Sequence, residues 1–210
     1  MATGEAKNKP RQHHVVPVSY LRRFSANGKL QVIDLFEKRR FVISPEKALR
    51  IRDFNTVETT TNRDESLIED IFQKIESPAA STIDSILSRV EIPTQADWAS
   101  LAKFVVLQEI RTVRFRREVW EQHQAHAKQL AQFMISSKEV YEGSMENYRR
   151  DTGVTDGLTY EEAVRTYNNM EIEVTIPQEY FIEAATKTYD ALLPIVMRMS
   201  PRLLVPSGKA

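Results

Sequence analysis

The chain has 210 residues, of which 41% are hydrophobic and 28% charged, a composition typical of one or two ordinary globular domains. Its 29 Lys and Arg residues balance 29 Asp and Glu residues, so the net charge provides no long-range attraction to nucleic acid, and any such binding needs a local basic patch. The absence of cysteine excludes disulfide frameworks and thiolate zinc sites.

The termini and the hydropathy predict the domain organisation. Residues 1–10 are polar and lack the apolar core of a signal peptide, and we predict that they form a flexible tail. No apolar run approaches the roughly 20 residues that a membrane-spanning helix needs. We therefore predict a cytoplasmic protein with no membrane partner and a single domain over residues 11–210. Its fold class is mainly α (α+β), a helical bundle with a small N-terminal antiparallel β-hairpin.

The N-terminal part of this domain begins with a histidine-rich segment and continues into a hairpin. In residues 11–24, Pro17 favours extended geometry before it and a short helix after it, with Tyr20, Leu21 and Phe24 as apolar anchors. The β-rich residues 30–36 and 41–43 predict the hairpin. Ser44-Pro45 predicts the start of a short helix that reaches residue 51, and residues 52–63 predict a loop.

The remainder of the chain has helical periodicity. Apolar residues recur at three- and four-residue steps from residue 67 to residue 90, and Pro78 either kinks this helix or separates two. Thr94 and Asp97 form the pattern of a helix N-cap, and residues 98–135, which lack glycine and proline, predict one long helix. Further helices are predicted over residues 137–150, 159–169 and 178–199, with a short strand over residues 171–177.

The segment Arg11-Gln12-His13-His14-Val15-Val16-Pro17-Val18-Ser19-Tyr20-Leu21-Arg22-Arg23-Phe24 resembles the opening signature of an uncharacterised bacterial family, domain of unknown function 4238. That signature is a basic residue, Gln-His-x-x-Pro and then Tyr-Leu-x-x-Phe. Residues 69–80 and the stretch Gln108 to Thr112 are similar to two further parts of the family pattern. The resemblance covers most of residues 11–125 and implies no known activity. It also implies a strand beyond the last residue here, so we expect that the chain is C-terminally truncated.

Two neighbouring histidines are the first candidates for chemistry. His13 and His14 before Val-Val-Pro are similar to the start of an HNH nuclease motif, in which one histidine activates water and another binds a metal. The asparagine and ligand helix that should follow are missing. The alternative is structural, with one histidine bonded to a backbone carbonyl so that it holds the N-terminus in place.

A composite polar site is the second candidate. Glu69 and Glu76 lie seven residues apart on one edge of their helix, and Gln108, Arg111 and Thr112 interrupt an apolar face defined by residues such as Trp98, Leu101, Val105 and Val119. If the two helices are antiparallel, these groups converge with the N-terminal histidines. They could then hold a divalent ion or, through Arg111, a phosphate. The alternative is a buried network that fixes helix register.

Other polar groups are weaker candidates. The arginines Arg111, Arg114, Arg116 and Arg117, with Arg22, Arg23, Arg39 and Arg40, form either a phosphate-binding face or a salt-bridged surface. His123 and His126 are spaced as a helical metal pair or as exposed side chains. Arg117 and His123 are also similar to the Arg-(x)n-His motif of HEPN ribonucleases, although the spacing is five residues where four is usual.

Two functions follow from these patterns. The first is a metal-dependent nucleic-acid or phosphoester hydrolase, whose partner is nucleic acid or a phosphorylated ligand and whose cofactor is a divalent metal. Its predicted catalytic residues are His13, His14, Glu69, Glu76, Gln108 and Arg111. The second is a non-catalytic helical binding module of a bacterial defence or regulatory assembly, with a protein partner or a second copy of the chain.

Overall fold

The computed structural model describes residues 12–58, 63–64, 67–89, 93–169, 173–202 and 204. The predicted tail, residues 1–10, lies outside them. The described residues group into two compact units, one from Met1–Arg116 with Gln178–Ala210 and one from Arg117–Pro177. The first is called unit 1 and the second unit 2. The mainly α class with an N-terminal hairpin is confirmed, whereas a single folding domain over residues 11–210 stays a prediction.

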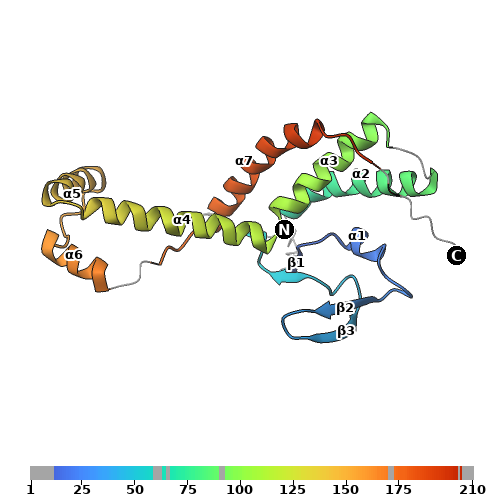
Figure 1. Ribbon diagram of the computed structural model, residues 1–210, viewed down its shortest axis with the longest axis horizontal. Coiled ribbons are helices and arrows are strands. Elements are labelled where there is room, and N and C mark those ends of the chain that lie inside the picture. The colour runs from blue at the N-terminus through green and yellow to red at the C-terminus, as the bar shows by residue number, and fades with distance from the viewer. Residues whose placement is uncertain are drawn as a thin grey trace, which may run out of the picture. The chain divides into compact units, whose positions relative to one another are not determined.

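The core of unit 1 consists of three helices, α2 (Leu67–Arg89), α3 (Gln95–Ile110) and α7 (Gln178–Met197). Helix α3 runs antiparallel to α2 and also packs on α7 (Figure 1). Because α3 is covered from two directions, its buried residues surround much of its circumference: Ala102, Phe104, Val106, Leu107 and Ile110. The predicted apolar face was wrong for this reason, and Val105 on that face is 49% exposed.

The helix predicted over residues 98–135 is two helices, α3 and α4 (Val113–Met134). The chain turns at Arg111 and Thr112, where the Thr112 hydroxyl accepts a hydrogen bond from the Phe115 amide at 3.0 Å and donates one to the Glu109 carbonyl at 3.0 Å. Threonine is a good N-cap because its hydroxyl can satisfy an amide that the new helix leaves unbonded. In contrast, Pro78 lies inside α2, which is one helix.

Short antiparallel strand pairs precede the helices. Strand β1 (Gln12–His14) pairs with β4 (Arg50–Arg52), β2 (Leu30–Asp34) with β3 (Arg39–Ile43), and β5 (Val57–Glu58) with β6 (Arg63–Asp64). The β2–β3 pair is the predicted hairpin. The short helix predicted over residues 44–51 was wrong, because the chain turns after Ser44, Leu49 takes a positive φ of 51° and residues 50–52 join the sheet with β1.

Helix α1 (Val18–Arg22) follows β1 and lies beside α2. Arg23 donates to the Ala80 carbonyl at 3.0 Å and pairs with Asp84, and the ring of Tyr20 packs against Phe104. Phe24 is not an anchor, since it is 65% exposed and contacts only the edge of Tyr20 among the described aromatic rings.

Unit 2 contains most of α4 with α5 (Lys138–Thr152) and α6 (Tyr160–Asn169). The strand predicted over residues 171–177 is absent from residues 173–177, and residues 171–172 lie outside the described part. Side chains take the place of a partner strand, because Val174 donates to Gln124 at 2.8 Å and accepts from Trp120 at 3.0 Å. Within the described residues no helix has the length and apolar character to cross a bilayer.

Candidate functional site

His13 is held in β1 as the best-buried polar side chain of the N-terminal segment, with an exposure of 1%. Its Nδ1 lies 3.2 Å from Glu69 Oε1, and the same oxygen accepts a hydrogen bond from the Asn55 amide at 2.7 Å. A carboxylate can only accept from Nδ1–H, so in the neutral ring Nε2 is the acceptor. That Nε2 is buried without a hydrogen-bond partner among the described residues.

Arg111 ends α3 and is 3% exposed. Its Nη1 pairs with Glu76 and its Nη2 donates to the backbone carbonyl of His14, while the guanidinium carbon lies 4.9 Å from the centre of the Phe72 ring. A buried cation is stable only when it is paired and hydrogen-bonded, and these contacts satisfy both terminal nitrogens. The Nε of Arg111 is buried without a partner among the described residues. Arg111 therefore joins α3, α2 and β1.

The structure brings together some of the predicted site residues and separates others. His13 contacts Glu69, and Arg111 contacts Glu76 and the backbone of His14, so two local pairs form. The His14 ring instead donates to the Glu46 carbonyl, 3.1 Å away, which is the carbonyl bond that the structural alternative predicts. Gln108 joins neither pair, and its amide nitrogen is buried without a partner in the described part of the chain.

The other candidate groups are distributed over several ion pairs. Arg22 pairs with Glu46 at 3.0 Å, Arg39 with Asp34 at 3.7 Å, and Arg117 with Glu121 at 3.8 Å. His123 bonds the carbonyl of Val119, one turn earlier in its own helix, and His126 is exposed. No group of three or more His, Asp or Glu side chains that could hold a metal ion occurs among the described residues.

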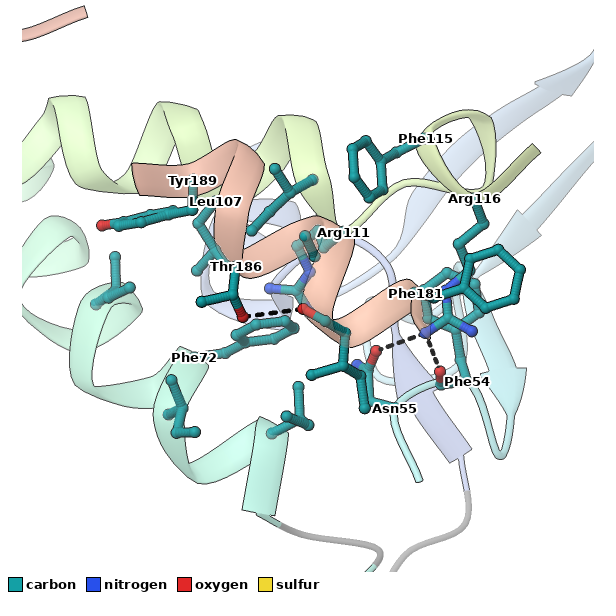
Figure 2. Close-up of a pocket in the computed structure, with 16 residues that line it drawn as sticks. Phe54, Asn55, Phe72, Leu107, Arg111, Phe115, Arg116, Phe181, Thr186 and Tyr189 are labelled. Atoms are coloured by element: carbon teal, nitrogen blue, oxygen red, sulfur yellow. Dashed lines mark hydrogen bonds between the residues drawn. The ribbon is translucent and has the colours of Figure 1, made fainter. Parts of the chain in front are cut away.

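A pocket opens beside these pairs, between α2, the end of α3, the start of α4 and α7 (Figure 2). It has a volume of about 180 Å³. Five isoleucines and four phenylalanines line it: Ile68, Ile71, Ile75, Ile110, Ile182, Phe54, Phe72, Phe115 and Phe181. Arg111, Arg116, Asn55, Thr186 and Tyr189 provide its polar groups. Burial raises the pKa of Tyr189, with a further contribution from Asp190, so its hydroxyl stays protonated.

Arg116 is the most unusual group of the pocket wall. Its guanidinium carbon lies 3.6 Å from the centre of the Phe54 ring and 5.5 Å from that of Phe181. It donates to the Phe54 carbonyl, to Gln178 Oε1 at 3.2 Å and to Asn55 Oδ1 at 3.4 Å. Burial lowers the pKa of Arg116 to about 10.

Sequence reasoning missed the pocket, although part of its signal was present. Phe181, Ile182, Ala185 and Tyr189 follow a helical spacing that marks one apolar face of α7. Phe54 carried no such signal, because it lies in a turn that begins at Asp53, which has a positive φ of 55°. Arg116 was predicted only as one cation of a basic run.

Comparison with known proteins adds a family and no activity. Over residues 12–210 the sequence matches the family described as protein of unknown function, DUF4238. The chain belongs to this family. The match extends beyond residues 11–125 and includes both units. Of the residues that resemble the opening DUF4238 signature, residues 12–22 form β1, α1 and their connection. No curated protein and no solved structure gives a match to the chain.

Proposed function

We propose that the domain is a non-catalytic binding module whose pocket takes a small, largely apolar ligand. The observation that carries this proposal is the cavity of about 180 Å³ with mainly apolar walls. In a regulatory assembly, a protein partner or a second copy of the chain would respond to whether this pocket is occupied.

The burial of His13 and Arg111, two of the predicted catalytic residues, supports a structural role for them. A general base must lie within hydrogen-bond reach of its substrate, directly or through one water. His13 is 1% exposed and does not line the pocket, and Arg111 donates both terminal nitrogens to groups of the chain itself. These pairs fix β1 and α2 against α3, as a buried network that sets helix register does.

The size and lining of the pocket indicate the kind of ligand. A cavity of about 150 Å³ with apolar walls can admit a benzene ring. Small-molecule sites are typically concave and mostly apolar, with a few polar groups that set the ligand's orientation. A ligand built on a single ring or a short branched chain therefore fits this pocket best.

The pocket isoleucines allow a direct test. We expect benzamide, used as a neutral single-ring probe, to shift the NMR signals of the Ile68, Ile71 and Ile182 methyl groups but not that of Ile33, which is 60% exposed on the hairpin. Ala185→Phe should abolish the shifts because it fills the cavity. Ala191→Phe, on an exposed position of the same helix, should leave them intact. Absence of saturable shifts in the wild-type protein would contradict the proposal.

One observation favours the hydrolase as a second candidate. His13 is oriented by Glu69 through Nδ1, as a general base is often oriented by a carboxylate, and its Nε2 has no bond among the described residues. Phosphodiester and phosphomonoester hydrolysis should be measured with Mg²⁺ and Mn²⁺ on the wild type, His13→Asn and Arg111→Lys. Activity that His13→Asn abolishes in a folded protein would support the hydrolase over the binding module.

A further inference from the structure

Arg116 differs from Arg111 in how its charge is compensated. Arg111 has the carboxylate of Glu76 as its partner, whereas the groups bonded to Arg116 are a backbone carbonyl and two side-chain amides, all neutral. Glu69 belongs to the same network but reaches Arg116 only through Asn55, whose amide nitrogen bonds the carboxylate. In the described structure, the half-buried guanidinium therefore has no anion against it.

This lack of an anion is costly in an apolar setting. Taking a cation out of water is unfavourable unless an opposite charge or strong hydrogen bonds replace the lost solvation. The rings of Phe54 and Phe181 and the three neutral acceptors replace part of it. The lowered pKa of Arg116 is the expected sign of incomplete compensation.

We infer that the ligand of this pocket is a monocarboxylate, whose carboxylate pairs with Arg116 while its apolar body occupies the rest of the cavity. The inference rests on the proposed binding function and adds the chemical class of the ligand. Figure 2 shows Arg116 beside Phe54 and Phe181 at one end of the pocket, and Tyr189 at the other. Between these ends the walls are mainly isoleucine and phenylalanine, so a molecule with one anionic end and an apolar body matches the lining.

The charge count favours a carboxylate over a phosphate. Arg111 and Glu76 neutralise each other, so Arg116 is the one uncompensated charge of the described pocket wall. A ligand with a single negative charge would compensate it. A phosphate monoester would bring a charge near −2 and leave an excess anion in an apolar cavity.

The test compares three probes with the same ring: benzoate, benzamide and phenyl phosphate. Dissociation constants come from the isoleucine methyl shifts of the full chain. In the wild type we expect benzoate to bind at least about tenfold tighter than either other probe, because a charge-assisted bond is stronger than a neutral one. In Arg116→Met this preference for benzoate over benzamide should vanish while benzamide binding is retained. Arg117→Met, which removes an exposed cation paired with Glu121, serves as the control, and this variant should keep the preference for benzoate.

The outcomes separate the two proposals. Equal binding of benzoate and benzamide to the wild type would overturn the monocarboxylate inference and leave the binding function standing. Tightest binding of phenyl phosphate would also overturn it, in favour of a phosphorylated ligand. Binding of none of the probes would overturn both. A preference for benzoate that survives in a folded Arg116→Met protein would show that another group recognises the carboxylate, against the inference.

Discussion

Arg111 donates a hydrogen bond to the backbone carbonyl of His14, a residue 97 positions earlier in the chain. The same guanidinium pairs with Glu76 of α2. Through this one side chain the N-terminal strand, α2 and the end of α3 are joined at a point that solvent barely reaches.

Removal of Arg111 should destabilise the protein strongly. Arg111→Met leaves the Glu76 carboxylate and the His14 carbonyl without their donor, and breaking a buried ion pair from one side costs about 3–5 kcal/mol. Urea unfolding followed by circular dichroism measures the loss. The double variant Arg111→Met/Glu76→Leu should recover part of it, because no unpaired charge then remains.

Arg117→Met is the matched control for that experiment. Arg117 forms an exposed ion pair with Glu121, and pairs of this kind contribute about 0–1 kcal/mol. If Arg111→Met cost no more than Arg117→Met, the buried pair would contribute little to the stability of unit 1.

Arg116→Met should behave differently from Arg111→Met. No carboxylate loses a partner, and the Phe54 carbonyl keeps its bond from Gln178 Nε2 at 2.6 Å. We expect the free energy of unfolding in the absence of ligand to change by less than about 1 kcal/mol, or to rise. The reason is that the substitution removes a cation that has no anionic partner from an apolar environment. The same unfolding series measures it, and a loss as large as that of Arg111→Met would contradict this account of the charge.

Thr112 should matter more than its exposure suggests. Its hydroxyl caps α4 at the turn that separates α4 from α3, and replacing a threonine N-cap by alanine costs about 0.5–2 kcal/mol. Thr112→Ala should therefore lower the free energy of unfolding by that amount, while Thr112→Ser, which keeps the hydroxyl, should restore most of it. Equal stability of the two variants would show that the hydroxyl does not act as a cap.

The start of α3 predicts a pH dependence. Hydrogen bonds from the Thr94 hydroxyl and amide, and then from Arg89, hold the pKa of Asp97 below its usual value. A carboxyl whose pKa is lower in the folded state stabilises that state above its unfolded pKa of about 3.9, and the contribution is lost as pH falls through the folded value.

The measurement compares the wild type with Asp97→Asn, so that other carboxyl groups cancel. The wild type should be the more stable protein at pH 5.5, and the difference in the free energy of unfolding should shrink as the pH is lowered to 3. A difference that stays constant over this range would mean that the Asp97 charge contributes nothing at the cap.

The fold was predictable where one local signal decides the structure. Thr94 with Asp97 forms the expected reciprocal cap, and the hairpin follows from its alternating β-rich sequence. The break at Thr112 was not predictable from the absence of glycine and proline, since a hydroxyl cap can end one helix and start another. The β4 strand was missed because its residues form it only by pairing with β1, far away in the sequence.

The candidate site shows the same division. The helix spacing allows the contact of Glu76 with Arg111 once α2 and α3 are antiparallel, which the sequence stated only as a condition. The contact of Glu69 with His13 also needs the position of β1, which helix periodicity does not predict. The pocket depends on the approach of α7 to α3, two helices that are distant along the chain, and on a turn that presents Phe54. No local pattern encodes such an approach.

Arg116 and Gln178 are the residues at which the chain leaves unit 1 and returns to it, and their side chains are hydrogen-bonded at 3.2 Å. Residues 117–177 are thus an inserted segment whose two ends lie next to each other. Insertions are tolerated where the two ends of the inserted segment are adjacent, because the rest of the fold does not have to change. A variant in which residues 117–177 are replaced should therefore keep unit 1 folded if it retains the first turn of α4, which carries Phe115 and Arg116 of the pocket wall.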